Sequence, residues 1–466
     1  MKESKYNFFI SDNDDNINLV YNSLRNTLIS DKDRKVQNFI QQCNGNIKYD
    51  PAYITNDEFN DLISSGIIIL DDFDEKQVAI DTNQMRLDIL QKDNKRLSLT
   101  IAPTLQCNFK CYYCFESPGI RKNTSSMGLD VQNDIIDFIT KSIAINHIKE
   151  VSITWCGGEP LLQLPIIISM QKKINKICKL FDVKNNNSSI ITNGILLSAE
   201  NCNLLYEHGI RNAQITIDGP EPVHNKRRHY PADPTNNYNL ILKNILNAND
   251  QLKFIIRINV DNSNKDLILD LIDNLIERKI WPYKNKIFIY LAYVESDSNK
   301  VFSRNEFTVL QDHIRRNLAD KYNDIKKTNK AKLKFHYPMY GGEPGCGYAI
   351  SKNVWVVDYN GDVFRCWEAV GRKEHAIGTI KDLSEDFGQS IFEQIKLSNT
   401  VFEQWGCFDC KFFPICGSLC PWDYLDNEER RCTQWKNTLE YKILNQYKQF
   451  LKEPELFRSI PFNIKK

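Results

Sequence analysis

The middle of the chain, from Leu97 to about Asp320, alternates short apolar runs with longer amphipathic ones. The short runs are predicted strands, and the longer ones are predicted helices because their apolar side chains recur every three or four residues. The predicted strands are Leu97–Ala102, Val151–Trp155, Ser189–Thr192, Gln214–Ile217, Phe254–Asn259 and Ile287–Tyr293. The predicted helices are Asp130–Ile145, Pro165–Leu180, Tyr238–Leu246 and Leu267–Ile276. Strands separated by helices imply parallel pairing with crossovers, so we expect an α/β fold whose six units form a partial (β/α)6, TIM-like barrel.

The chain before this region has a different pattern. Tyr6–Ile10 and Leu19–Tyr21 are predicted strands, two short helical patterns follow, and the apolar run Ile67–Leu70 could return to the sheet. Strands followed by two or three helices indicate a winged-helix-like module, which we expect to span residues 1–93.

From about residue 330 helical periodicity is lost, and cysteines, glycines and aromatic residues become dense. Val354–Val357 and Val363–Arg365 flank Asn360-Gly361, a dipeptide that favours the tight turn of a β-hairpin. Thr433 to Leu451 is a predicted closing helix. We therefore expect an N-terminal module of residues 1–93, a barrel of residues 97–325, a cysteine-rich domain of residues 335–440 and a helical tail of residues 441–466.

Charge and composition exclude several classes of protein. There are 60 basic side chains against 59 acidic ones, a formal net charge of +1, and residues 1–93 carry ten Lys and Arg against seventeen Asp and Glu. Neither balance gives the basic face that binding to nucleic acid or anionic lipid requires. No apolar run approaches the length that spans a bilayer, and Met1 to Asn16 lacks the apolar stretch of a signal peptide. We expect a soluble, cytoplasmic protein with no nucleic-acid or membrane partner.

Ten of the 14 cysteines fall in two groups, which in a large chain without an export signal indicates ligation of a metal or cluster. The first group, Cys107, Cys111 and Cys114, has C-x3-C-x2-C spacing directly after the first predicted barrel strand. Three close thiolates can hold three irons of a [4Fe–4S] cluster and leave the fourth iron open. The alternative is a structural zinc site, which would normally need a fourth Cys or His at short spacing, and none lies nearby.

This loop resembles the cluster-binding motif of the radical S-adenosylmethionine (SAM) superfamily, and the resemblance extends from about Leu97 to Asp320. It implies that the three cysteines bind a [4Fe–4S] cluster and that Tyr113 lies against SAM. Gly157-Gly158-Glu159-Pro160 resembles the family's GGEP motif, whose backbone and carboxylate receive the SAM amino group. The resemblance places further SAM-site residues at later strand ends, where barrel folds build active sites: Asn193, Thr216, Asp218, His224 and Arg228.

The second group of cysteines resembles the SPASM domain, an extension of radical SAM enzymes that carries auxiliary clusters. The resemblance implies one set of ligands for a distal [4Fe–4S] cluster and one for a proximal cluster. The distal set is Cys407, Cys410, Cys416 and Cys432, and the proximal set is Cys346, Cys366 and Cys420. Two fully cysteine-ligated clusters need eight thiolates, and this segment has seven. Either the open proximal iron binds a substrate thiolate, or water or another side chain completes it. A zinc ribbon would explain only four of these cysteines.

The resemblance implies three [4Fe–4S] clusters and bound SAM. It also implies that SAM is cleaved to methionine and a 5′-deoxyadenosyl radical, which takes a hydrogen atom from an unactivated carbon. We expect a peptide maturase of the thioether-forming ranthipeptide or sactipeptide type, which installs a thioether or C–C crosslink in a ribosomally made precursor. The N-terminal module resembles the recognition element that captures a leader peptide as an added strand; the alternative is a simple cap on the barrel. A flavodoxin or ferredoxin is the expected electron donor.

Two other functions remain open. The first is an anaerobic sulfatase-maturating enzyme, which oxidises Cys or Ser to formylglycine. That family places an aspartate directly after the second SPASM cysteine, where this chain has Trp367. The second is a non-enzymatic iron–sulfur or zinc protein, against which the motif residues at three successive strand ends argue.

Overall fold

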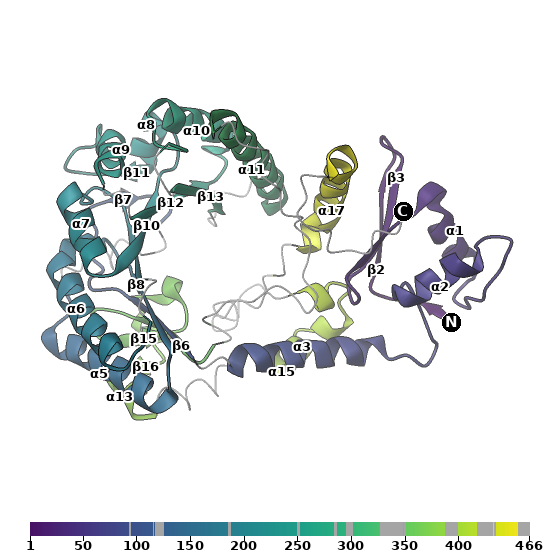
Figure 1. Ribbon diagram of the computed structural model, residues 1–466, viewed down its shortest axis with the longest axis horizontal. Coiled ribbons are helices and arrows are strands. Elements are labelled where there is room, and N and C mark those ends of the chain that lie inside the picture. Colours follow the sequence, from purple (N-terminus) through teal and green to yellow (C-terminus); the bar gives the residue numbers. More distant parts are fainter. Residues whose placement is uncertain are drawn as a thin grey trace. The chain divides into compact units, whose positions relative to one another are not determined.

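A computed structural model of the chain describes residues 1–92, 95–114, 116, 125–184, 188–248, 252–283, 287–294, 302–326, 348, 351–386, 399–416, 432 and 435–454 (Figure 1). The chain forms two compact units, which are described separately here. The terminal unit comprises Met1–Leu90, Lys326–Ile350 and Leu397–Lys466, and the sheet unit comprises Gln91–Ile325 and Ser351–Lys396. The expected division into four domains stays a prediction.

The sheet unit is built on a nine-stranded sheet of order β13-β12-β10-β9-β8-β6-β14-β15-β16. Its first six strands are β13 (Ile287–Tyr293), β12 (Lys253–Val260), β10 (Ile210–Thr216), β9 (Ser188–Thr192), β8 (Glu150–Trp155) and β6 (Arg96–Ile101). These are the six predicted strands, and all of their pairings are parallel as expected. Their carboxyl ends therefore lie at one edge of the sheet. That the sheet curls into a partial barrel stays a prediction.

Helices connect these strands. They are α5 (Leu129–Asn146), α6 (Leu164–Leu180), α7 (Ala199–Glu207), α8 (Glu221–Arg227), α9 (Asn237–Asn247), α10 (Ile268–Glu277) and α11 (Arg304–Lys326). The four predicted helices are confirmed as α5, α6, α9 and α10. In α6, Ile167, Met170 and Ile174 are buried at helical spacing, while Lys172 and Lys176 are exposed. Each helix of this kind buries one apolar face against the sheet, which is the main source of its stability.

The predicted hairpin around Asn360-Gly361 is confirmed as β14 (Val354–Val357) and β15 (Asp362–Phe364), and Gly361 has the positive φ of 84° that the turn requires. β14 also pairs in parallel with β6, and β16 (Gly378–Thr379) pairs with β15. The predicted hairpin thus extends the six-stranded sheet, together with β16, which the sequence pattern does not predict. The pairing of β14 with β6 joins segments about 250 residues apart, which local periodicity cannot reveal.

The terminal unit contains a three-stranded antiparallel sheet of order β2-β3-β4 and a smaller sheet of two strands. Its N-terminal elements are β1 (Lys2–Glu3), β2 (Asn7–Asp12), β3 (Ile17–Asn22), β4 (Thr27–Ser30), α1 (Lys35–Gln42), α2 (Asn56–Ser64), β5 (Ile68–Ile69) and α3 (Glu75–Lys92). The order of strands followed by helices agrees with the expectation, although β5 pairs with β1 and not with the larger sheet. The winged-helix assignment stays a prediction.

C-terminal elements complete the core of the terminal unit. They include α15 (Asn399–Gln404) and α17 (Trp435–Lys452), which confirms the predicted closing helix. In α17, Trp435 and Leu439 belong to one apolar cluster with Phe8 and Leu19 of the three-stranded sheet. Lys448 of the same helix forms an ion pair with Asp15, at 2.6 Å between Nζ and Oδ2. The N-terminal strands and α17 thus share one core.

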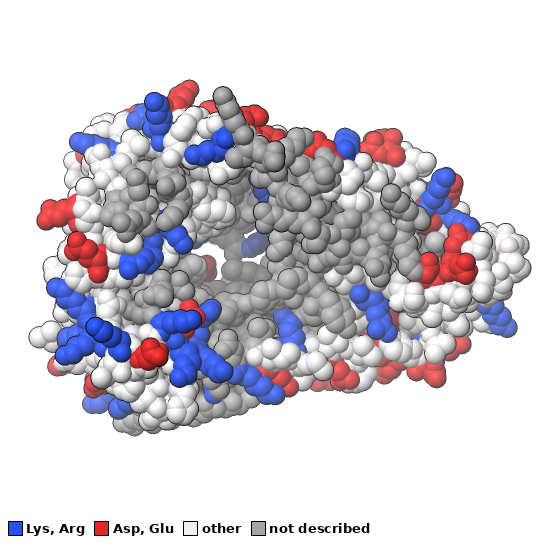
Figure 2. Space-filling view, in the orientation of Figure 1, with Lys and Arg blue, Asp and Glu red and all other residues white. Residues whose placement is uncertain are grey.

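Neither sign of charge covers the face of the molecule seen in Figure 2, where basic and acidic side chains are both distributed. No helix in the described part of the chain combines the length and the apolar composition that crossing a bilayer needs.

A buried amide holds the first strands of the terminal unit together. The Asn22 Nδ2 group donates to Ser4 Oγ at 3.0 Å, Asn7 Oδ1 at 2.8 Å and the Gly66 carbonyl oxygen at 2.9 Å, and Asn22 Oδ1 accepts from the Arg25 amide at 2.8 Å. These groups are buried or half-buried, so losing their shared partner leaves them without the hydrogen bonds that water would provide.

We therefore expect Asn22→Ala to lower the free energy of unfolding of the terminal unit by about 2–3 kcal/mol. Urea unfolding of the full chain, followed by circular dichroism, measures this effect. The matched control is Asn60→Ala, which removes an exposed amide on α2 and should change stability by less than about 0.5 kcal/mol. Equal effects of the two substitutions would contradict the role assigned to Asn22.

Candidate active site

The Cys107–Cys114 loop begins a few residues after β6, at the carboxyl edge of the sheet. Its short strand β7 (Lys110–Cys111) pairs with β11 (Arg228–His229), which places Cys111 opposite Arg228. None of the three cysteines is in a disulfide, and the Phe109 amide donates to Cys107 Sγ at 3.4 Å. Burial raises the pKa of the Cys107 thiol to about 12, and Glu159 adds to this. Ligation would therefore release a proton from this thiol.

The Gly157-Gly158 pair packs directly on the backbone of this loop. A Cβ atom on Gly158 would lie 2.3 Å from the Gln106 carbonyl oxygen and 2.4 Å from that of Leu105, and one on Gly157 would lie 2.3 Å from the Thr104 carbonyl oxygen. The Glu159 amide donates to the Gln106 carbonyl at 2.8 Å. Both positions therefore need glycine so that the two segments can approach each other.

The carboxylate of Glu159 joins the ends of two strands. It has 0% exposure and accepts hydrogen bonds from Thr192 Oγ1 at 2.7 Å, the Asn193 amide at 2.8 Å and the Leu161 amide at 3.0 Å. Burial raises the pKa of Glu159, although these donors act in the opposite direction. Its oxygens thus serve the end of β9, while the backbone of the motif faces the cysteine loop. The contact of this carboxylate with the SAM amino group, which the resemblance implies, stays a prediction.

Asn193 continues this connection toward the cysteines. Its Nδ2 donates to Asn108 Oδ1, inside the cysteine loop, at 2.6 Å. Thr216 is the last residue of β10 and is buried. The sequence-predicted residues at the ends of β8, β9 and β10 are thus brought to the edge of the sheet where the loop lies.

Asp218, Tyr113 and Arg228 form a buried cluster at the end of β10. Tyr113 Oη donates to Asp218, Arg228 Nη1 donates to Tyr113 Oη at 2.7 Å, and the Asn259 amide donates to Asp218 Oδ1 at 3.0 Å. Burial raises the pKa of Asp218, and the nearby Arg228 lowers it in part. Burial alone would lower the pKa of Arg228, but Cys111, Tyr113 and Asp218 outweigh it and raise that pKa well above its usual value. Arg228 is thus a fixed cation beside a candidate cluster ligand.

A second, parallel cluster was missed by sequence reasoning. Arg227 Nη1 donates to Asp261 Oδ1 at 2.8 Å and to Tyr112 Oη at 2.7 Å, and Tyr112 Oη in turn donates to Asp261. Arg227 Nε also lies 3.7 Å from Asp218 Oδ2. The sequence does contain a pattern that could have predicted this cluster. It has two adjacent tyrosines, Tyr112-Tyr113, two adjacent arginines, Arg227-Arg228, and an aspartate after β12 as well as after β10.

His224 lies next to these ion pairs. It is buried, and its Nδ1 accepts a hydrogen bond from the Asp218 amide at 3.3 Å. Burial lowers the pKa of His224 well below its usual value, and both arginines lower it further. The ring is therefore neutral, and the hydrogen bond that it accepts fixes the backbone of Asp218.

The auxiliary cysteines are described in part. Cys366 follows β15 in the sheet unit, whereas Cys407, Cys410, Cys416 and Cys432 belong to the terminal unit. Cys346 and Cys420 lie outside the described residues. Among the residues that are described, no three His, Cys, Asp or Glu side chains lie close enough to hold a single metal ion. In a [4Fe–4S] cluster each thiolate binds a different iron. The two auxiliary ligand sets stay predictions.

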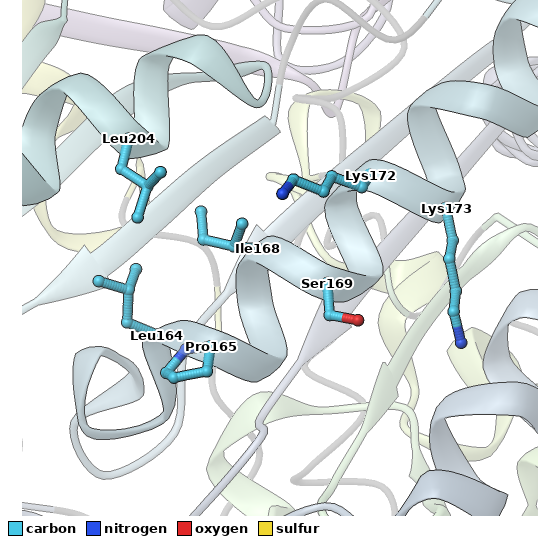
Figure 3. Close-up of a pocket in the computed structure, with 7 residues that line it drawn as sticks. All are labelled: Leu164, Pro165, Ile168, Ser169, Lys172, Lys173 and Leu204. Carbon is cyan, nitrogen blue, oxygen red and sulfur yellow. The ribbon is translucent and has the colours of Figure 1, made fainter.

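A pocket of about 370 Å³ lies between α6 and α7, away from the motifs. Figure 3 shows the residues that line it: Leu164, Pro165, Ile168, Ser169, Lys172, Lys173 and Leu204. It contains none of the predicted site residues, and we do not assign it to SAM.

Comparison with known proteins identifies the class. Residues 101–301 match the family model of the radical SAM superfamily. This part of the chain is therefore similar to a radical SAM domain, as the cysteine loop predicts. The matched residues include the cysteine loop, the glycine pair and both arginine–aspartate clusters.

Curated relatives and solved structures are similar to parts of the chain. The GTP 3′,8-cyclase of Clostridium perfringens (strain 13 / Type A) is 31% identical over 187 residues, 39% of this chain and 52% of that protein. The chain thus spans about half the length of the curated relatives it matches. The structure of native anSMEcpe with bound AdoMet and Cp18Cys peptide has a TM-score of 0.54 at 18% identity, covering 78% of this chain and 98% of that one. Native anSMEcpe with AdoMet alone gives 0.51 at 20% identity, covering 77% and 98%. These structures share the fold.

The packing of Gly158 against the cysteine loop gives a direct test. We expect Gly158→Ala to displace the loop, because its Cβ would overlap two carbonyl oxygens, and to destabilise the chain by about 1–3 kcal/mol. After anaerobic reconstitution, the variant should hold about four irons per chain fewer than the parent, the content of one [4Fe–4S] cluster.

Gly128→Ala is the matched control, because nothing lies within 4 Å of a Cβ added there. It should keep the iron content of the parent. If Gly158→Ala loads iron as fully as Gly128→Ala, the packing argument is wrong.

Proposed function

We propose that the chain is a radical SAM enzyme that installs a thioether or C–C crosslink in a ribosomally made precursor peptide. The observation that carries this proposal is the terminal unit, which joins a small sheet and a cysteine-rich loop in one core. Residues 1–100 and 302–466 lie outside the match to the radical SAM family, so these parts are where a specialised substrate would be selected.

The residues at the sheet edge fit the cofactors of the superfamily. Cys107, Cys111 and Cys114 lie on one loop without disulfide partners, and Arg228 is a buried cation opposite Cys111. They would hold a [4Fe–4S] cluster, and the backbone at Gly157 and Gly158 would lie against SAM. When bound, the cluster and SAM supply a 5′-deoxyadenosyl radical that removes a hydrogen atom from a substrate carbon.

The side chains around this site orient and exclude water. Arg228 is 8% exposed, and its Nε has no hydrogen-bond partner in the described structure, so it retains a donor for the carboxylate of SAM. Tyr113 is held by both Asp218 and Arg228, which fixes its ring beside Cys114. Burial strengthens these interactions because the local dielectric is low.

The terminal unit supports a peptide as the substrate. β2 and β4 are the outer strands of its sheet, and in the described residues each is hydrogen-bonded to β3 alone. An extended leader peptide can add to such an edge through backbone hydrogen bonds. The fold is shared with anSMEcpe, whose structure holds the Cp18Cys peptide.

A crosslink removes two hydrogen atoms from the peptide, so after the first hydrogen atom is taken the substrate must also lose an electron and a proton, and the proton is released to solvent or a base as the new bond forms. The cysteines of the two C-terminal ligand sets would hold auxiliary [4Fe–4S] clusters that accept it. A flavodoxin or ferredoxin would supply the electron that starts the reaction.

Two alternatives are weighed against this proposal. Sequence similarity to GTP 3′,8-cyclases favours cyclisation of a nucleotide, although the alignment covers 39% of this chain. In the sulfatase-maturating alternative, an aspartate follows the second SPASM cysteine. Here that position is Trp367, which begins a 3₁₀ turn, Trp367–Ala369, after Cys366, so an indole stands where a carboxylate would act as the base.

One assay separates these functions. The anaerobically reconstituted chain, reduced with dithionite in the presence of SAM, is given either a Cys-containing precursor peptide from a neighbouring open reading frame or GTP. We expect 5′-deoxyadenosine together with peptide that has lost two hydrogen atoms by mass spectrometry, and unchanged GTP.

A variant with Cys107, Cys111 and Cys114 all replaced by Ala is the control and should form neither product. If GTP is converted and the peptide stays unmodified, the chain is a GTP cyclase and the proposal is wrong. If the peptide gains formylglycine, the chain belongs to the sulfatase-maturating class.

A further inference from the structure

Tyr6, which directly precedes β2, has a buried hydroxyl group that the proposed function leaves unexplained. Its side chain has 0% exposure, and Tyr6 Oη has no hydrogen-bond partner in the described structure. A buried tyrosine hydroxyl normally finds a partner, because it gives up hydrogen bonds to water on burial. The group therefore points to a missing acceptor.

The surroundings of Tyr6 contain candidate cluster ligands. Tyr6 belongs to one apolar cluster with Cys407, and Cys410 packs against the same cluster. Leu24 and Leu87, from the N-terminal module, complete the packing on these cysteines. Burial raises the pKa of the Tyr6 hydroxyl, and the charges of Glu75, Asp409 and Cys410 raise it further. The hydroxyl is thus within electrostatic reach of the cysteine loop.

The loop that carries these cysteines suits an iron–sulfur cluster. Cys407, Cys410 and Cys416 are not in disulfides and are spaced along two 3₁₀ turns, Cys407–Asp409 and Phe413–Ile415. Thiolates are the ligands that iron–sulfur clusters use. An iron–sulfur cluster bound by thiols of this loop would offer the acceptor that Tyr6 lacks, because the sulfide and thiolate sulfurs of such a cluster accept hydrogen bonds.

The N-terminal module contacts the same loop at several further points. Lys76 Nζ pairs with Asp409 Oδ1 at 2.6 Å, and Ser23 Oγ donates to the Lys411 carbonyl at 3.1 Å. Burial lowers the pKa of Arg86 on α3, and the charge of Cys416 acts in the opposite direction. The module therefore forms one wall of the site.

We propose that Tyr6 donates its phenolic O–H to a sulfur of the auxiliary [4Fe–4S] cluster held by Cys407, Cys410 and Cys416, and so raises the reduction potential of that cluster. This inference rests on the auxiliary cluster of the proposed function. The reduced cluster carries one more negative charge than the oxidised one, so a hydrogen bond to sulfur stabilises it preferentially. The module that would recognise the peptide thereby also tunes an electron acceptor of the reaction.

Tyr6→Phe tests the proposal, because it removes the hydroxyl and keeps the ring. The substitution is made in a full chain whose Cys107, Cys111 and Cys114 are replaced by Ala, so that only auxiliary clusters contribute to the spectrum. A redox titration followed by electron paramagnetic resonance should give an unchanged iron content and a more negative midpoint potential.

Tyr238→Phe is the matched control, since Tyr238 is a buried tyrosine of the sheet unit whose Oη donates to Asn274 Oδ1 at 2.7 Å. It should leave the midpoint potential unchanged. An unchanged potential in Tyr6→Phe, with full iron content, would overturn the role of Tyr6 and leave the proposed function standing.

Thermal unfolding provides a second test, because a role in packing alone would change the Tm equally with and without iron. In the metal-free chain, Tyr6→Phe should leave the Tm unchanged or raise it, because it removes a buried hydroxyl without a partner. In the iron-loaded chain it should lower the Tm. The same change of Tm in both forms would overturn the proposal. A parent background without auxiliary iron would overturn both this proposal and the auxiliary clusters on which it rests.

Discussion

The site depends on two buried carboxylates, Glu159 and Asp218, which have no exposed surface and must find their partners inside the protein. Glu159 takes its partners from β9 and the segment after β8, so it fixes the ends of two neighbouring strands. Asp218 takes its partners from Tyr113, Arg227 and the end of β12. The cost of an unsatisfied buried charge therefore dictates where the cysteine loop can lie, because Tyr113 is part of that loop.

The chemistry of the site follows from this arrangement. Once Tyr112 and Tyr113 are bound to their aspartates and arginines, Cys111 and Cys114, which flank them in the sequence, are held at the edge of the sheet, with Arg228 opposite Cys111. A fixed cation next to a thiol favours the thiolate that a metal requires. The buried ion pairs need not stabilise the fold in total, since desolvation offsets their attraction, but removing one partner would leave the other charge uncompensated. These ion pairs matter because they impose a single geometry on the cysteine loop.

Sequence patterns predicted the parts of this structure that depend on local spacing. The six parallel strands, four of the helices, the Asn360-Gly361 hairpin and the cysteine loop all have short-range signals, and each is found. Other features join segments that are distant in the sequence, and a single sequence does not show such connections. They are the pairing of Arg227 with Asp261 and Tyr112, the addition of β14 to β6, and the core that α17 shares with the N-terminal strands. The hydrogen bonds of Glu159 to Thr192 and Asn193 also join segments that are distant in the sequence, and its contact with the SAM amino group stays a prediction.

The central claim is that Cys107, Cys111 and Cys114 hold a cluster whose fourth iron is open to SAM. It is tested most directly by electron paramagnetic resonance of the dithionite-reduced chain in which Cys366, Cys407 and Cys410 are replaced by Ala, so that the loop cluster dominates the spectrum. The account predicts a reduced [4Fe–4S] signal whose g-values shift when SAM is added. The g-values should stay unchanged when adenosine is added instead. A spectrum that SAM leaves unaltered, or the absence of any cluster signal, would contradict it.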